Sequence, residues 1–196
     1  MRPGDADGSL RCQDWGVDSL RGQLLIAGPS LWDPNFRRTV VLIGHHDDEG
    51  AVGVVLNRPL EATVAEAVPP LSPIVPPGES LFAGGPVQPE AAVVLADFEE
   101  PERAGIIALE SIGFLPEETG PDEIGALRRA RVFAGYAGWG AGQLEAEMEE
   151  DSWHAAPAFP GDVFTDDPDG LWGAVVERLG PAFRLLRTMP IDPQMN

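Results

Sequence analysis

The chain has 196 residues, 43% of them hydrophobic and 23% charged, and its formal net charge is −19 at pH 7. These values are typical of one soluble globular domain that builds its own core without disulfides. All 13 basic residues are arginines, which excludes reactions that depend on a lysine, such as Schiff-base catalysis. The acidic balance also argues against generic nucleic-acid binding, because the field of the whole molecule repels phosphate.

The cysteine count and the N-terminal sequence predict the cellular location. The single cysteine, Cys12, cannot form an intrachain disulfide, which is typical of a reducing compartment. No apolar stretch approaches the roughly 20 residues that cross a bilayer. Residues 1–20 carry aspartates where a signal peptide has its apolar segment. We therefore expect a cytoplasmic protein without membrane contact, with a disordered or loosely docked tail over 1–20 and one domain over 21–196.

The first predicted elements are strands. Residues 22–29 form a short apolar run closed by Gly-Pro, which predicts a strand, and a turn is expected over 30–36. The β-branched runs 39–45 and 51–56 surround the acidic turn 47–50, a pattern that predicts a β-hairpin. Because both runs are almost continuously apolar, we expect both faces of the hairpin to be covered.

The middle of the chain combines a helix start with a proline-rich loop. Thr63 and Glu66 have the spacing of a capping box, so a short helix is expected to begin there. The prolines of 69–77 end it and predict a surface loop. Further strands are predicted over 80–85, 91–96 and 106–109.

The C-terminal half contains two longer predicted helices. Residues 121–130 are expected to form a helix with proline at its start. The basic cluster Arg128, Arg129 and Arg131 is then interpreted as the cationic end of that helix. The remaining predictions are a strand over 131–136, a glycine-rich turn over 138–142, a helix over 143–150, short strands over 152–155 and 162–165, and a helix from Asp167 to about Leu179.

The order of these elements predicts the fold class. Helices are inserted irregularly among strands of antiparallel type, and no regular strand–helix alternation or internal repeat is visible. This pattern indicates an α+β fold: a single compact domain with a mixed, mainly antiparallel sheet flanked by several helices. Tryptophans 139, 153 and 172 are expected to be core anchors, and the acidic runs 97–102 and 145–151 are expected to be solvated.

Neither a metal site nor a catalytic nucleophile is predicted. His45 and His46 are followed by two aspartates, but neighbouring strand residues point to opposite faces of a sheet, and a metal needs three or four convergent ligands. We interpret this segment as an exposed hairpin tip. Ser30 does not lie in a nucleophile elbow, and Cys12 lies in the predicted tail. No cofactor is expected.

Two patterns remain as candidate ligand sites. The glycine-rich stretch before residue 143 can expose backbone N–H groups to an anion, although the glutamates behind it oppose phosphate; alternatively, its glycines allow close packing of the neighbouring aromatic rings. Polar residues and glycines also follow two predicted strands, where ligands bind and where chains simply turn. The tentative ligand-binding residues are Asn57, Arg58, Gly84, Gly85, Tyr136, Gly138, Trp139 and Gln143.

Several of these segments together resemble the bacterial YqgE/AlgH family, in order over roughly 21–196. The matching blocks are GQLLIA (22–27), DPNF (33–36), RTV (38–40), GAVGVVLNRP (50–59), GGPV (84–87), GYAGW (135–139) and GQLE (142–145). The resemblance implies a compact α+β protein without an established biochemical activity and with a proposed role in regulating transcription. The reactive cysteines of some members do not carry over, because Cys12 lies outside the match.

We therefore expect a non-enzymatic regulatory or interaction protein. The alternative is a small-ligand-binding protein or enzyme with its site around Asn57, Arg58, Gly84, Tyr136 and Trp139. A third hypothesis, direct regulation through DNA, is disfavoured by the charge of −19 and by the lack of a helix-turn-helix pattern. The expected partner is a protein or a small molecule of unknown identity.

Overall fold

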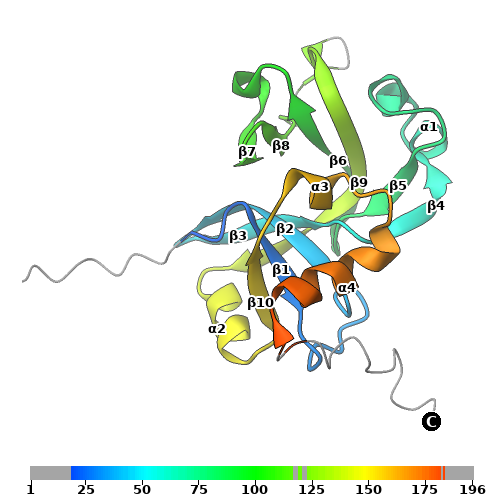
Figure 1. The fold of residues 1–196 in the computed structure, drawn as a ribbon. Helices are drawn as coiled ribbons and strands as arrows, with labels where there is room; N and C mark the ends of the chain where they lie inside the picture. The colour runs from blue at the N-terminus through cyan, green and yellow to red at the C-terminus, as the bar shows by residue number, and fades with distance from the viewer. Residues whose placement is uncertain (1–18, 117–118, 121–122, 182, 184–196) are drawn as a thin grey trace, which may run out of the picture.

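The computed structural model describes residues 19–116, 119–120, 123–181 and 183. Its strands form a 10-stranded sheet in the order β10-β1-β2-β3-β9-β6-β8-β7, with β5 added beside β9 and β4 beside β5. All strand pairs are antiparallel except β5 with β9. The α+β class with a mixed, mainly antiparallel sheet is confirmed (Figure 1).

The elements follow one another along the chain as β1 (Gln23–Ala27), β2 (Val40–Asp47), β3 (Gly50–Val55), β4 (Pro59–Thr63), α1 (Val64–Ala67), the 3-10 helix η1 (Pro69–Ile74), β5 (Ser80–Ala83), β6 (Val87–Phe98), the 3-10 helix η2 (Pro101–Arg103), β7 (Ile106–Leu109), β8 (Ile112–Phe114), β9 (Leu127–Gly140), α2 (Gln143–Glu149), β10 (Trp153–Pro157), α3 (Pro160–Val163) and α4 (Pro168–Arg178). The predicted tail over 1–20 lies outside the described residues except for Ser19 and Leu20.

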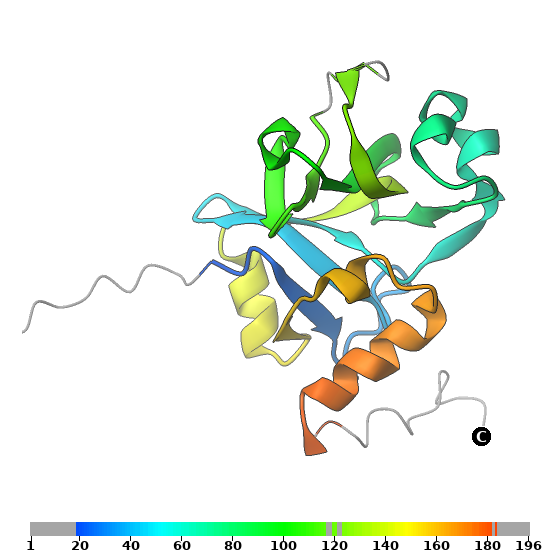
Figure 2. The ribbon, with the colours of Figure 1, turned by 45° about the horizontal axis from the view of Figure 1, so that its top comes forward.

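The predicted hairpin is confirmed as β2 and β3, and helices cover both of its faces. Val41 and Ile43 pack with Leu144 of α2, whereas Leu42 packs with Val175 of α4. Successive strand residues point to opposite faces, so a strand covered on both sides is apolar at every position. Figures 1 and 2 show α2 and α4 on opposite sides of β1 and β2.

The predicted helix over 121–130 is wrong where the structure describes it. Leu127 begins β9, which continues to Gly140 and pairs with β6 between Leu127 and Tyr136. Residues 121 and 122 lie outside the described part of the chain. The segment contains good helix formers, but pairing with a long neighbouring strand outweighs intrinsic propensity, which differs by less than about 1 kcal/mol per residue.

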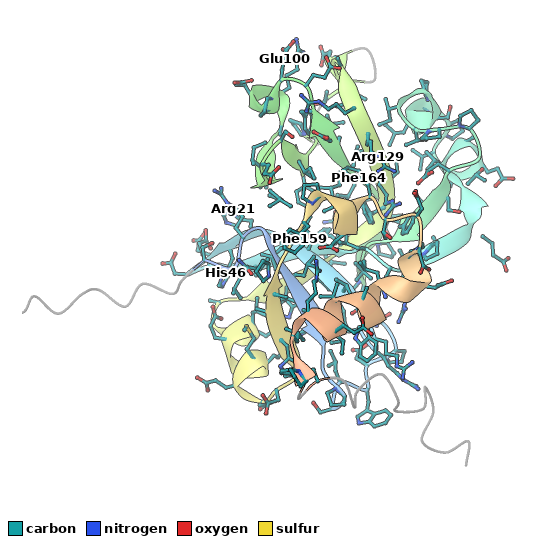
Figure 3. All side chains as sticks on the ribbon, in the orientation of Figure 1. Arg21, His46, Glu100, Arg129, Phe159 and Phe164 are labelled. Atoms are coloured by element: carbon teal, nitrogen blue, oxygen red, sulfur yellow. The ribbon has the colours of Figure 1, made fainter. Side chains whose placement is uncertain are left out.

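The arginine cluster therefore lies on a strand and not at a helix end. Arg128 pairs with Asp97, and the Arg129 guanidinium lies over the Phe164 ring (Figure 3). Arg131 is buried and donates hydrogen bonds to the carbonyls of Val163 and Thr165. Burial lowers the pKa of Arg131 below its ordinary value. This side chain ties β9 to the segment that connects α3 with α4.

The C-terminal elements are partly as predicted. Strand β10 confirms the prediction over 152–155, and α4 confirms the last helix, with Asp167 as its N-cap. The strand predicted over 162–165 is wrong, because residues 160–163 form α3, which starts with a proline at its first position. Proline fixes φ near the helical value and lacks the N–H that a helix start leaves unused.

The predicted capping box is confirmed at Thr63 and Glu66. Hydrogen bonds from the Thr63 backbone N–H and hydroxyl lower the pKa of Glu66. We expect Thr63→Ala to lower the free energy of unfolding by about 1 kcal/mol. The Glu66 carboxylate contributes at neutral pH and loses its contribution as the pH falls through its lowered pKa. Urea titrations should show Glu66→Gln approaching the wild type in acid; a difference that grows in acid contradicts this assignment.

Candidate functional site

The connection between β1 and β2, residues 28–39, is a surface loop with many internal hydrogen bonds; we call it the 28–39 loop. The Asp33 carbonyl accepts from the backbone N–H groups of Phe36 and Arg37, and the Thr39 hydroxyl donates to the Phe36 carbonyl at 2.7 Å. Trp32, in the same loop, is 56% exposed. The loop therefore displays a large aromatic side chain from a well-ordered backbone.

Two residues of the predicted ligand site hold this loop from the connection between β3 and β4. Asn57 is 3% exposed; its Nδ2 donates to the Arg38 carbonyl at 2.9 Å, and its Oδ1 accepts from the Val40 N–H at 2.9 Å. Arg58 donates from Nη2 to the Arg37 carbonyl. Burial lowers the pKa of Arg58, an effect that nearby Asp169 partly offsets. The polar groups of both side chains thus bind the backbone of the loop.

A second anchor is aromatic and involves Trp139. The Phe36 ring stacks on Trp139 with centroids 6.1 Å apart and meets Trp153 edge-on at 5.4 Å. The Glu147 Oε2 atom accepts from both indole N–H groups, at 3.0 Å from Trp139 and 2.8 Å from Trp153. Of the two interpretations of the glycine-rich stretch, this geometry favours close packing, because Trp139 is buried beneath the loop.

The start of α2 completes this anchor. Gln143 accepts from the Gly140 N–H at 3.1 Å and donates to Glu147 at 2.8 Å. The acidic run over 145–151 is therefore more than a solvated face, since Glu147 binds three side chains. The turn predicted over 138–142 is shorter than expected, because residues 138–140 still belong to β9.

The remaining predicted residues lie where β5 meets β9. The Gly84 N–H donates to the Ala134 carbonyl at 2.9 Å, and its carbonyl accepts from the Val55 N–H at 2.8 Å. Gly85 lies against the Tyr136 backbone, where a Cβ would approach closer than 3.0 Å. Tyr136 packs against the main core cluster.

The structure thus separates the eight predicted residues into three groups. Asn57 and Arg58 lie at the 28–39 loop, the second group lies between β5 and β9, and the third lies at α2. The second group is Gly84, Gly85 and Tyr136, with Gly138 beside the Tyr136 ring on β9, and the third is Trp139 and Gln143. A ligand site built from all of them stays a prediction.

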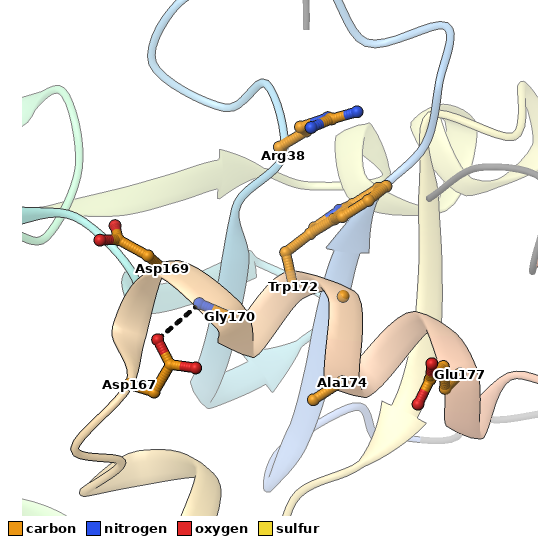
Figure 4. A pocket seen from close by; sticks show the side chains of 8 residues that line it. Arg38, Asp167, Asp169, Gly170, Trp172, Ala174 and Glu177 are labelled. Carbon is orange, nitrogen blue, oxygen red and sulfur yellow. Dashed lines mark hydrogen bonds between the residues drawn. The ribbon is translucent and has the colours of Figure 1, made fainter. Parts of the chain in front are cut away.

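A pocket that the sequence analysis missed lies between the 28–39 loop and α4; we call it the α4 pocket. Its volume is about 410 Å³, and its lining comprises Arg38, Asp167, Asp169, Gly170, Trp172, Gly173, Ala174 and Glu177. The Arg38 guanidinium lies over the Trp172 ring, 5.0 Å from its centroid (Figure 4). The Trp172 indole donates to the Ala27 carbonyl at 3.2 Å, which fixes the ring.

Arg37 forms a second stack on the same loop. Its guanidinium carbon lies 5.6 Å from the centroid of the Trp32 ring, and its Nη2 atom is buried without a hydrogen-bond partner. A buried donor without an acceptor costs about 1–3 kcal/mol. Two consecutive arginines therefore each lie over a tryptophan. The sequence shows the two adjacent arginines, but it does not show which rings they cover.

The prediction that the histidine pair forms an exposed hairpin tip holds for only one of the two residues. His45 is exposed, but His46 is buried (Figure 3); its Nε2 atom lies 2.8 Å from Glu145 Oε1, and its Nδ1 accepts from the Leu20 N–H at 3.0 Å. The opposite orientations of the two rings are as predicted. Within the described ranges, no three His, Cys, Asp or Glu side chains gather as a metal site. No helix there is long and apolar enough to cross a bilayer.

Comparison with known proteins places this chain in a family. The AlgH-like family model matches residues 24–184. A UPF0301 protein of Thermobifida fusca is 42% identical and covers 91% of this chain and 96% of its own. A UPF0301 protein of Streptomyces coelicolor is 41% identical over 92% of this chain and 97% of its own.

Two solved structures have the same fold. A crystal structure of a Corynebacterium diphtheriae protein superposes with a TM-score of 0.75 at 29% identity and covers 86% of this chain and 91% of that chain. The solution structure of the AlgH protein from Pseudomonas aeruginosa gives a TM-score of 0.67 at 30% identity and covers 97% of this chain and 98% of that chain. The family model and these relatives span most of the sequence, and the chain belongs to the AlgH-like family.

Proposed function

We propose that this protein is a cytoplasmic, non-enzymatic interaction protein that binds a partner protein through the 28–39 loop and the α4 pocket. The observation that carries the proposal is that residues from two separate segments of the family resemblance hold one surface loop. Asn57 and Arg58 bind its backbone, and Trp139 stacks on its Phe36. An arrangement that orders an exposed loop so thoroughly supports a role for that loop in recognition.

The side chains that the loop presents are those of binding hot spots. Tryptophan and arginine are the residues most enriched where alanine substitution costs a protein interface the most. Here Trp32 is exposed beside Arg37, and Arg38 covers Trp172 at the pocket. Because the loop is already ordered, binding requires little further loss of conformational entropy.

The lining of the α4 pocket supports binding more than turnover. Among the residues that the structure describes, its charged groups are three carboxylates and one guanidinium, and no serine, cysteine or histidine that could act as a nucleophile or a base near neutral pH lines it. Asp167 and Asp169 are exposed to solvent, and one Asp167 oxygen caps α4 at 3.0 Å from the Gly170 N–H.

In this proposal the protein regulates by binding another protein and not by binding DNA. The net charge of −19 repels a duplex. We expect fluorescence anisotropy of labelled DNA to stay flat up to micromolar protein at low salt, where phosphate contacts are strongest. Saturable, salt-sensitive binding would contradict the proposal and favour direct regulation.

The proposal is tested by affinity capture with two variants beside the wild type. Trp32→Ala removes the exposed ring from the 28–39 loop. Phe159→Ala is the matched control, because Phe159 is also an exposed aromatic, at 52%, and also lies under an arginine, Arg178. Proteins captured from the source cells would be quantified by mass spectrometry, purified and titrated against each variant by calorimetry.

The expected result is a purified partner whose affinity falls at least about tenfold with Trp32→Ala, as for a hot-spot residue of about 2 kcal/mol. Phe159→Ala should leave this affinity unchanged. A partner that binds all three proteins equally would show that the interaction uses another surface, and the proposal would be wrong.

A further inference from the structure

His46 is a buried titratable side chain at the end of β2, away from the 28–39 loop and the α4 pocket. Its side chain is 1% exposed. The Nδ1 atom accepts from the Leu20 N–H at 3.0 Å, and the Nε2 atom lies 2.8 Å from Glu145 Oε1. Because both ring nitrogens have a partner, the hydrogen bonds decide which of them carries the proton.

A bulge in β2 aims this ring at α2. Ile43 faces α2, and simple alternation along the strand would turn residue 45 toward the same helix. The register between β2 and β3 shifts between Ile43 and His45, so His46 faces α2 instead. The intervening Gly44 has no room for a side chain, because a Cβ would lie 2.2 Å from the Phe114 ring. The bulge therefore places a histidine between α2 and the residues that precede β1.

Those residues, 19–22, are held to β2 by hydrogen bonds; we call them the 19–22 segment. The Ser19 hydroxyl donates to the carbonyl of the same histidine at 2.9 Å, and the Gly22 N–H donates to the Ile43 carbonyl at 2.8 Å. The Leu20 N–H donates to the ring, and the Leu20 side chain packs against the apolar cluster on the α2 side of the sheet. Of these hydrogen bonds, the one from Leu20 depends on the protonation state of the ring.

The direction of that hydrogen bond fixes the tautomer. A backbone N–H can donate to Nδ1 only while Nδ1 has a free electron pair, so the neutral ring of His46 carries its proton on Nε2 and donates it to Glu145. A second proton can bind only at Nδ1. There it would face the Leu20 N–H, with one donor pointing at another. Protonation of the ring and the contact with Leu20 therefore exclude each other.

The charge that contacts the ring favours a cation. Glu145 of α2 is 34% exposed, and a carboxylate at this distance stabilises a protonated imidazole. On β3 the residue opposite is the apolar Ala51. Asp47 of β2 pairs with the exposed His45, and Arg21 of the 19–22 segment is exposed (Figure 3). Glu145 thus favours the added proton, whereas the 19–22 segment opposes it.

We propose that His46 makes the docking of the 19–22 segment conditional on pH: the neutral ring holds the segment, and the protonated ring releases it. The proton binds Nδ1, the Leu20 N–H turns to water, and the ring keeps Glu145 as its partner. A contact that requires the neutral ring is complete at high pH and is lost on acidification. This inference is independent of the proposed function, because it concerns a different part of the surface.

The test follows two signals of the full ¹⁵N-labelled chain from about pH 8 to about pH 5, the range in which histidines change charge. These signals are the ring nitrogens of His46 and the amide of Leu20. We expect the ring to become an imidazolium and hydrogen exchange of the Leu20 amide, corrected for its intrinsic pH dependence, to become about 3- to 10-fold faster. Amides inside β2, such as that of Val41, should keep their protection, because the release is local.

Matched variants identify the group that titrates. His46→Asn keeps an acceptor near the position of Nδ1 but does not titrate, so Leu20 should stay protected at every pH. Glu145→Gln removes the charge that favours the cation, so release should require more acid. Glu149→Gln removes the same charge from an exposed position on the same helix, and His45→Gln removes the exposed histidine; both should release at the pH of the wild type.

Each contrary result overturns the proposal. A Leu20 amide that is unprotected even beside the neutral ring shows that the contact does not form, and one that stays protected beside the imidazolium shows that it does not depend on the proton. A ring that stays neutral until the whole protein unfolds has no local effect. Loss of protection in His46→Asn at the pH of the wild type would mean that another group controls the segment.

Discussion

Glu147→Ala is expected to lower the free energy of unfolding by about 3–5 kcal/mol, because one carboxylate serves two buried indoles. Its Oε2 atom accepts from Trp139 and Trp153, and its Oε1 accepts from Gln143. Hydrogen bonds to a charged acceptor contribute about 1.5–3 kcal/mol each, and the substitution leaves both indole donors without it. In a domain of this size, each kcal/mol lowers the midpoint of thermal unfolding by about 2–4 °C.

The matched control is Glu149→Ala, which removes an exposed carboxylate from the same helix. Its effect should stay within about 0.5 kcal/mol, as is usual for surface substitutions. Calorimetry or urea titration measures both variants. A Glu147→Ala protein within about 1 kcal/mol of the wild type would show that water replaces the carboxylate, and the assignment of Glu147 as the central acceptor of this cluster would be wrong.

Gly84→Ala is expected to be at least as damaging, because the added methyl group has no space. A Cβ at this position would come closer than 3.0 Å to the Gly135 carbonyl oxygen and to the Phe133 Cβ. Overpacking of a well-packed site costs about 1–3 kcal/mol and more where backbone must move. Here the strands β5 and β9 would have to separate, so we expect a loss of about 3 kcal/mol or more, or insoluble protein.

Gly161→Ala provides the control, since no atom lies within 4 Å of the position where its Cβ would stand. This variant should be as stable as the wild type or slightly more stable, because alanine restricts the unfolded chain. Thermal unfolding of the two variants checks the pair. Equal stabilities would mean that β5 and β9 accommodate a side chain at Gly84, contrary to the close approach in the structure.

Elements with strong local signals were predictable from the sequence. The hairpin of β2 and β3, the capping box at Thr63 and the start of α4 at Asp167 are all confirmed. Each depends on hydrogen bonds or periodicity within a few residues, so neighbouring residues specify it. The strand β4 was missed, since its exposed residues carry no apolar alternation.

Elements that depend on distant partners were not predictable. Residues 127–130 were expected to be helical, and they became a strand because β6 pairs with them. Glu147 was expected to be solvated, and it accepts from two tryptophans that the fold brings together. In both cases the deciding free energy comes from contacts that no short segment contains.

The sequence by itself therefore determined the fold class and the family, because these depend on local patterns and on ordered blocks of residues. It also singled out Asn57, Arg58 and Trp139, but as ligand-binding candidates and not as anchors of a loop. Only the tertiary structure decided what those residues hold. Trp172 donates to Ala27, 145 residues away, and this contact places α4 beneath Arg38. The α4 pocket exists because folding packs the 28–39 loop against α4, two segments that are far apart in the sequence.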